Sequence, residues 1–262
     1  MKSHVHYFSQ KDCIKKDVDL DTLGQRGRQA NEFAELGFPI LPGFIINSNV
    51  ASRLANEDVI AAIKPFMKKV DAMVGKAYAD IGEPMLVKIV ISPNLAISNY
   101  PALHNFGLTV KTVGGFTKFV GENFAAHEVA FLARGMLKIE ERIAELENRE
   151  KDLGAIRERI VTTSKVMDSA KSGMKAVAIM DSYSDILPKG FFSDPWKQLD
   201  IAIKRISRML DMDDQDDSDT AILVQPMVYG NYGKNSASGA FYTRNVVNGE
   251  KKLQGEYFVE RF

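Results

Sequence analysis

The sequence has little of several features that would place it in a specialised class of protein. Its 262 residues include one cysteine, Cys13, which excludes an internal disulfide and suits a reducing cytoplasm. No apolar run reaches the roughly 18 residues that span a membrane, and the first residues, MKSHVHYFSQKDC, lack the apolar stretch of a signal peptide. Basic and acidic residues both number 34, so no net field attracts nucleic acid. We expect a cytoplasmic protein whose partners include neither nucleic acid nor a membrane.

Motifs for metal binding and catalysis are also missing. His4 and His6 lie on a terminal tail and supply two of the four ligands that a structural zinc site needs. The glycines between Gly230 and Lys234 do not have the spacing of a P-loop. We therefore predict no metal ligand and no catalytic residue from motifs.

Three segments differ in their pattern of apolar residues. Residues 1–118 have the pattern of an α/β region, with a helix over Leu23–Leu36 and a buried strand over Met85–Ile91. Residues 119–220 are mostly helical, and residues 221–262 contain strands of period two between Asn/Gly turns. The expected fold is α/β (α+β), with a helical insertion and a carboxy-terminal antiparallel meander.

The helical segment has two interpretations. Its apolar residues between Leu132 and Ile160 recur at threes, fours and sevens, a spacing that suits a coiled coil with another chain or a hairpin within one domain. The stripe is interrupted at Glu150 and Gly154, which favours the hairpin.

A glycine-containing loop opens the first predicted helix. Residues 23–33 read LGQRGRQANEF, with Arg26 between Gly24 and Gly27. Glycines before a helix let backbone amides approach phosphate, and a basic residue adds charge-assisted hydrogen bonds. A helix start with solvated arginines has the same pattern, so the loop alone leaves both readings open.

Several motifs together resemble one known family. The loop LGQRGRQANEF resembles LGGKGANLAEM, and the following LGFPILPGF resembles LGLPVPPGF. Residues 191–199, FFSDPWKQL, resemble FPQDPWEQL, and the carboxy-terminal strands carry VQPMVYGN, SGAFYTRN and GEKKLQGEY. In order and spacing these resemble the amino-terminal ATP-binding domain of the pyruvate phosphate dikinase and phosphoenolpyruvate synthase family.

The resemblance implies an ATP-grasp-like fold, ATP as cofactor and a set of nucleotide-binding residues. Arg26 stands at the family's phosphate-binding lysine, and the VQPMV strand stands where the family lines the adenine pocket. Magnesium would accompany ATP, although the resemblance covers only part of that site. The implied binding residues are Arg26, Gly27, Lys88, Gln225, Met227, Val228, Gly239, Thr243 and Arg244.

The sequence departs from the family at two places that bear on activity. Val90 stands at an arginine that binds the moving phosphates, and Lys88 lies two residues away on the same strand face, where it could substitute. The sequence ends at Phe262, whereas the family continues through an acidic metal-binding strand, a phosphohistidine domain and a pyruvate barrel. We expect an ATP/AMP-binding domain that does not complete phosphotransfer by itself, with a second polypeptide or downstream domains as partners. The alternative is a non-catalytic, degenerate paralogue that binds a partner or regulates it.

Overall fold

The computed structural model describes most of the chain, in two compact units. Unit 1 is Met1–Met227 and unit 2 is Val228–Phe262. The described residues are 1–14, 17–95, 100–101, 103–168, 175–213, 219–230 and 234–259. The predicted division at residues 118 and 220 stays a prediction.

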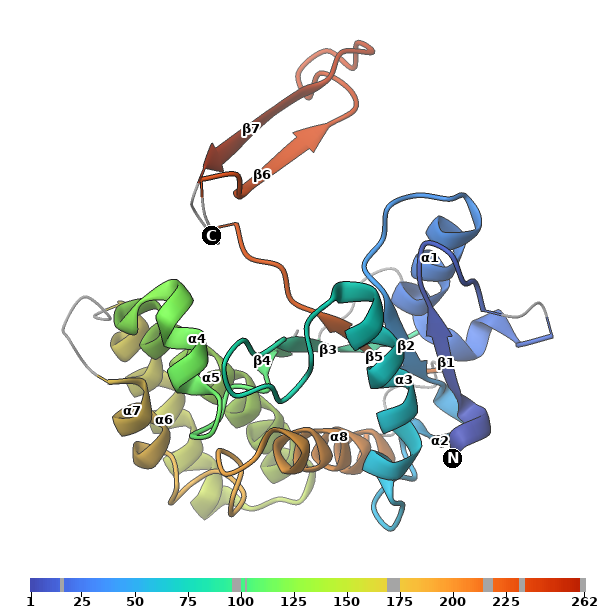
Figure 1. The fold of residues 1–262 in the computed structure, drawn as a ribbon. Coiled ribbons are helices and arrows are strands. Elements are labelled where there is room, and N and C mark those ends of the chain that lie inside the picture. Colours follow the sequence, from blue (N-terminus) through green and yellow to red (C-terminus); the bar gives the residue numbers. More distant parts are fainter. Residues whose placement is uncertain are drawn as a thin grey trace. The chain divides into compact units, whose positions relative to one another are not determined.

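A five-stranded antiparallel sheet forms the centre of unit 1 (Figure 1). Its strands, in spatial order, are β1 (Val5–Phe8), β2 (Gly43–Ile46), β5 (Ala221–Pro226), β3 (Val87–Ser92) and β4 (Leu103–Phe106). The central position of β5 follows from its sequence, because Ala221–Val224 is apolar on both faces and buried throughout. A mixed α+β class with antiparallel sheets is thereby confirmed.

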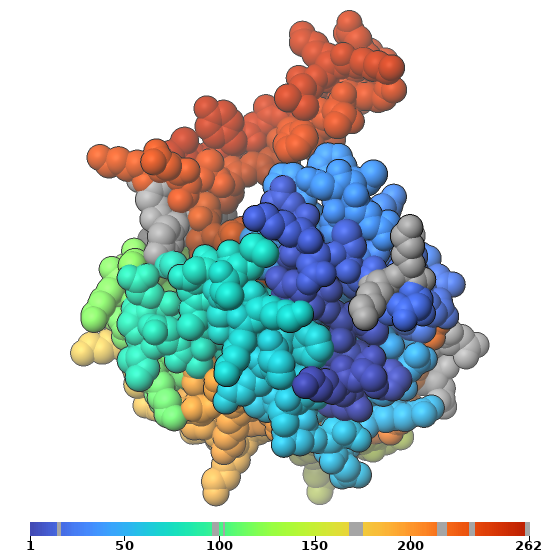
Figure 2. Space-filling view, turned by 45° about the vertical axis from the view of Figure 1, so that its right-hand side comes forward, coloured from blue at the N-terminus to red at the C-terminus, as the bar shows by residue number. Residues whose placement is uncertain are grey.

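Helices cover the two faces of this sheet. The ring of Phe44 lies 6.3 Å from that of Phe66 on the α3 face, whereas Gly27 of α1 lies against Ile45 on the other face. Figure 2 shows the amino-terminal residues (dark blue) beside α3 (cyan), a contact that includes Lys69 Nζ 5.0 Å from the ring of Tyr7. The helices are η1 (Lys2–His4), η2 (Leu20–Leu23), α1 (Gly24–Glu35), α2 (Ser48–Ala51), α3 (Val59–Val74), α4 (Val113–Val120), α5 (Glu122–Leu146), α6 (Glu150–Asp168), α7 (Ala176–Ser182) and α8 (Pro195–Met212).

The helical region is a hairpin packed on the sheet. Helices α5 and α6 pack against each other after a break at which Asn148 has φ 56°. α5 also contacts α8 and β4 of the same chain, so its apolar stripe is buried within unit 1. The Asp194 side chain caps α8 by accepting hydrogen bonds from Trp196 N (2.9 Å) and Lys197 N (3.2 Å), which suits Asp-Pro at a helix start. Of the described helices, none is both long enough and apolar enough to cross a membrane.

The carboxy-terminal strands do not form the single meander that the sequence suggested. In unit 2, β6 (Ala237–Tyr242) pairs with β7 (Gln254–Val259), whereas β5 pairs with β2 and β3 in unit 1. The reason is compositional: β5 is apolar over its first four residues and buried, whereas β6 and β7 include Gly, Ser, Gln and Glu and are almost wholly exposed. An isolated two-stranded hairpin of this kind is marginally stable in water.

Candidate functional site

A cavity of about 550 Å³ opens on the α1 face of the sheet. Its walls come from α1, from β3 with the loop after it, and from the end of β5. The described residues that line it are Gln25, Arg26, Gln29, Ala30, Phe33, Lys88, Val90, Ile91, Ser92, Pro93, Leu95, Tyr100, Leu223 and Gln225.

The start of α1 is tied to the end of β3, and this places Arg26 at the cavity. Gln25 N donates to Pro93 O (3.0 Å), and Arg26 N donates to Ser92 Oγ (2.9 Å). Gly24 makes the close approach possible, because a Cβ there would lie 1.9 Å from Ser92 O. These amides already have partners, so the charge that the loop offers to a ligand is on the Arg26 side chain.

Strand alternation brings Lys88 to the same cavity. In the sheet register Lys88 pairs with Gln225 and Val90 pairs with Leu223, so all four lie on the α1 face. The Gln225 side chain is held by a hydrogen bond from its Nε2 to Leu41 O (3.2 Å). Arg26, Lys88 and Gln225, which the sequence predicted as binding residues, therefore line one cavity.

The charged side chains among the described lining residues are of one sign. Of the described lining residues, Arg26 and Lys88 are cations and none is Asp or Glu. Within the described part of the chain neither cation forms an ion pair, and the Arg26 guanidinium has one long hydrogen bond, to Gln29 Oε1 (3.4 Å). Burial, and then the nearby Arg26 charge, lowers the pKa of Lys88 below its usual value. Two uncompensated cations beside each other favour an anionic ligand.

Two charged groups close to the cavity, Arg28 and Asp213, already have partners. Arg28, one residue beyond Gly27, binds Asp21 (2.9 Å) and Asn94 (2.9 Å). Asp213 lies 3.5 Å from the hydroxyl of Tyr100, but its carboxylate is held by Arg142 at 2.9 Å. The carboxylates of Asp21 and Asp213 are thus held by Arg28 and Arg142, and neither forms an ion pair with Arg26 or Lys88.

Several apolar side chains also line the cavity. Phe33 and Leu95 are exposed at its rim, and Leu223 and Val90 form part of its floor. Apolar walls with a few polar anchors are typical of small-ligand sites. The position of Phe33 follows from helical periodicity, since it lies seven residues after Arg26 on one helix face, whereas Ser92 and Tyr100 carried no signal in the sequence.

The other predicted binding residues lie outside this lining. Gly27 packs against Ile45, and Met227 donates its backbone N–H to Leu86 O (2.8 Å) just beyond β5. The remaining four, which belong to unit 2, are Val228, Gly239, Thr243 and Arg244. There the guanidinium of Arg244 donates to Gly249 O (3.1 Å), and a Cβ at Gly239 would lie 2.3 Å from Glu256 O of the paired strand. Their part in binding stays a prediction.

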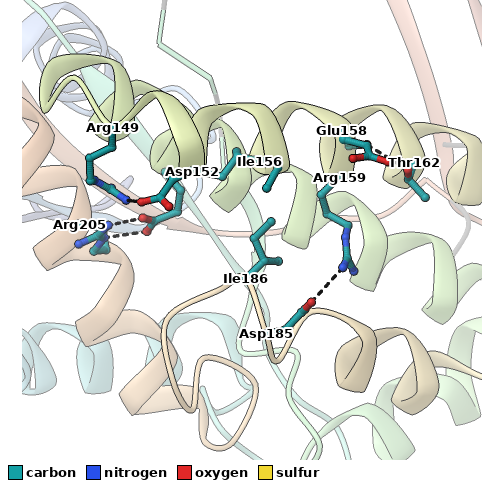
Figure 3. A pocket seen from close by; sticks show the side chains of 11 residues that line it. Arg149, Asp152, Ile156, Glu158, Arg159, Thr162, Asp185, Ile186 and Arg205 are labelled. Atoms are coloured by element: carbon teal, nitrogen blue, oxygen red, sulfur yellow. Dashed lines mark hydrogen bonds and ion pairs between the residues drawn. The ribbon is translucent and has the colours of Figure 1, made fainter.

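A second cavity, of about 520 Å³, lies in the helical region and has a different electrostatic character (Figure 3). Each of its three arginines is paired: Arg205 with Glu140, Arg149 with Asp152, and Arg159 with Asp185 (3.1 Å). An incoming anion would have to compete with these carboxylates. The cavity beside α1 is therefore the better candidate for an anionic ligand.

The described residues build a metal site in neither cavity. The described residues contain no group of three His, Cys, Asp or Glu side chains that could hold a metal ion. Magnesium prefers oxygen ligands such as carboxylates, and the described lining beside α1 offers none. The chain's described residues thus do not fit magnesium there, and phosphate oxygens would have to supply its ligands.

Fold and site together define an α+β protein with a cavity between a helix start and an antiparallel sheet, whose described lining includes two cations and no carboxylate. Comparison with known proteins shows which proteins the chain is similar to. The chain is 45% identical over 258 residues to the pyruvate, phosphate dikinase of Treponema pallidum, which covers 98% of this chain and 29% of that protein. It is 24% identical over 279 residues to the pyruvate, phosphate dikinase of Entamoeba histolytica. This match covers 97% of this chain and 30% of that protein.

The chloroplastic pyruvate, phosphate dikinase 1 of Arabidopsis thaliana is 26% identical over 258 residues, with 90% of this chain and 26% of that protein covered. No protein-family model matches the sequence. Nearly the whole length of this chain matches one part of a pyruvate, phosphate dikinase, which confirms the family resemblance. It spans less than a third of the length of these curated relatives.

Proposed function

We propose that the cavity beside α1 binds the phosphates of ATP or a related adenine nucleotide. The observation that carries the proposal is the convergence of Arg26 and Lys88 on a cavity whose described lining has no carboxylate. Holding two cations close together without a counter-charge is unfavourable, and a polyphosphate would offset that repulsion. Its oxygens also suit the forked donors of arginine and the point charge of lysine.

The apolar part of the cavity wall suggests the orientation of the bound nucleotide. We propose that the base and ribose lie along Phe33, Leu95 and Leu223 toward Gln225, while the phosphates lie between Arg26 and Lys88. Stacking on an aromatic ring and burial against aliphatic side chains are favourable for a base of any identity. Selection of adenine would then rest on backbone groups at the end of β5.

Binding without transfer is the proposed extent of the activity. Phosphoryl transfer depends on positioning and on stabilising charge on the moving group. Val90 contributes no charge at the cavity floor, and the described lining supplies no magnesium ligand. We therefore propose a nucleotide-binding part of a pyruvate, phosphate dikinase-type protein, ATP-grasp-like and cytoplasmic, that depends on other domains or a second polypeptide for catalysis.

Replacing Arg26 tests the binding proposal. The wild-type chain is expected to bind ATP or ADP with a Kd between about 1 μM and 1 mM. Arg26→Ala should weaken binding by roughly 1.5 kcal/mol, or about tenfold, because a charge-assisted hydrogen bond is lost. Isothermal titration calorimetry measures both.

Arg53→Ala is the matched control, because Arg53 is exposed in the turn after α2, where Leu54 N bonds to Ser207 of α8, and it does not line the cavity. Absence of binding by wild type at millimolar nucleotide, or equal losses in the two variants, would contradict the proposal.

Adding a cation at Val90 should strengthen binding. Val90 is half-buried on the cavity floor, two residues from Lys88 on the same strand face. Val90→Arg is expected to tighten ATP binding by roughly 1–2 kcal/mol, or about tenfold, with a steeper dependence on salt. Val90→Met supplies length without charge and should leave affinity near that of wild type. Equal affinities of the two variants would show that phosphate does not reach this part of the floor.

A further inference from the structure

A polar row crosses three adjacent strands beside the cavity. Gln225 of β5 pairs with Lys88 of β3, and on the other side of Lys88 the ladder to β4 is irregular. Val87 pairs with Phe106 and Ile89 pairs with Leu103, so Lys88 alone opposes two residues, His104 and Asn105. This is a β-bulge, a feature that re-aims side chains.

The bulge separates the two side chains of β4. Asn105 has φ 70°, is fully buried, and donates from Nδ2 to Glu128 Oε2 of α5 (2.6 Å). Leu103 pairs with Ile89 and shares its face of the sheet, so the adjacent His104 lies on the opposite face, which is that of Lys88. The polar row of the site is thus Gln225, Lys88 and His104.

The surroundings of His104 oppose a charge on its ring. The ring stacks on Phe131 of α5 (centroids 5.4 Å apart, planes at 14°), and its Nδ1 is buried without a hydrogen-bond partner among the described residues. Burial, followed by the Lys88 charge, lowers the pKa of His104, and the Glu128 carboxylate acts in the opposite direction. The ring is therefore mainly neutral at pH 7 in the free protein.

Other charged groups near this ring come from the elements packed against β4. Lys88 faces it from β3, and α5 contributes Glu128 and His127. The Glu128 carboxylate is shared, since Oε2 accepts from Asn105 and Oε1 lies 2.8 Å from His127 Nδ1. From α8 the contact with the segment after β4 is the neutral Gln198, whose Oε1 accepts from Gly107 N (2.8 Å). Lys88 is thus the charge next to His104 that a ligand in the cavity would neutralise.

We propose that His104 is a third basic group of this site and takes up a proton when a polyphosphate occupies the cavity beside Lys88. The inference rests on the proposed function. A polyphosphate offsets the positive potential that Arg26 and Lys88 create, so protonation of the ring is less unfavourable in the complex than in the free protein. His104 does not line the cavity itself; it is a positioning residue that acts on the ligand through the field at Lys88.

The sign of the pH dependence follows from linkage. If His104 holds its proton more tightly in the complex than in the free protein, nucleotide affinity is highest when both states are protonated and falls as pH rises through the interval between the two pKa values. Between pH 5.5 and pH 7.5 the ratio of wild-type affinity to that of His104→Gln is expected to decrease by about three- to tenfold. The nucleotide's own phosphate titrates in both proteins and cancels in this ratio.

The experiment combines calorimetry with NMR. ADP is titrated into wild type and His104→Gln at several pH values, and at pH 6.5 in two buffers of different ionisation enthalpy, which counts the protons taken up. The chain has four histidines, so their imidazole signals can be followed individually with and without ADP. His6→Gln is the matched control, because His6 is half-buried on β1 at the opposite edge of the sheet. We expect the His104 titration to move to higher pH with ADP and that of His6 to stay.

The outcomes separate the two proposals. No ADP binding by wild type would overturn the proposed function, and this inference with it. Binding with parallel pH profiles in wild type and His104→Gln, or an unchanged His104 titration, would overturn the inference alone. If His104→Gln fails to fold, the wild-type NMR titration decides, with the His104 signal assigned by elimination from variants of the other three histidines.

Discussion

Gly24→Ala is expected to lower the free energy of unfolding by about 3–5 kcal/mol, the sum of a strained backbone and an overpacked contact. Gly24 has φ 64° and ψ 169°, a conformation open almost only to glycine. A Cβ there would lie 1.9 Å from Ser92 O and 2.7 Å from Ser92 Oγ, so β3 and α1 would have to separate. Because the same contact places Arg26 at the cavity, nucleotide affinity should fall as well. Urea unfolding followed by circular dichroism measures the loss of stability.

Gly75→Ala is the matched control for this substitution. Gly75 ends α3 with φ 75° and ψ 14°, and no heavy atom lies within 4 Å of a Cβ built there. Gly75→Ala should lower the free energy of unfolding by about 1 kcal/mol, the usual penalty of a left-handed conformation. It should leave nucleotide affinity unchanged. Equal losses of stability in the two variants would mean that the contact between Gly24 and Ser92 is not the cause.

Local signals in the sequence were enough for several elements of the fold. Asp194 before Pro195 is a local signal for a helix start, and the structure shows the Asp194 side chain capping two backbone amides of α8. Glycines around residues 24–37 likewise predicted α1, because helix ends are governed by residues within one turn. Such signals need no knowledge of the remainder of the chain.

These local signals could not predict which strands pair when they are far apart in the sequence. The strand at Ala221–Pro226 was expected to continue into the strands that follow it, yet it pairs with β2 and β3, which lie more than a hundred residues earlier. Alternation gives the face of a strand but not its neighbour. The same limit explains His104: without the register of β3 and β4, no pattern shows that one extra residue turns it toward Lys88.

The site was predictable in part, and for identifiable reasons. Arg26 was identified by resemblance to a phosphate-binding lysine, and Lys88 by its strand alternation with Val90. The sequence did not show which charged side chains lie next to these two residues. In the structure, Arg28 has a counter-ion in Asp21, whereas Arg26 and Lys88 have none among the described residues. Natural proteins keep such unfavourable local arrangements mainly at functional sites.

Because Arg26 and Lys88 lie close together without a counter-ion among the described residues, Lys88→Glu is expected to keep the stability of the fold and lose ligand binding. A carboxylate at this half-buried position would face Arg26 and replace a repulsive pair with an attractive one, so the free energy of unfolding should stay within about 1 kcal/mol of wild type. Polyphosphate binding should nevertheless fall by about 100-fold or more, because an anion now meets like charge in the cavity. Titration with a fluorescent ATP analogue and urea unfolding measure the two quantities on the same preparation.

Two further variants separate charge from shape in this test. Lys88→Met removes the cation while keeping most of the side-chain volume, and it should weaken binding by about tenfold, between wild type and Lys88→Glu. Lys68→Glu makes the same charge reversal at an exposed position on α3, outside the cavity lining, and should leave affinity within about twofold of wild type once salt screens long-range fields. Nucleotide affinity that is the same in Lys88→Glu, Lys88→Met and wild type would mean that the ligand does not bind beside Lys88. A large loss in Lys68→Glu would instead attribute the effect to net charge, since the two reversals alter it equally.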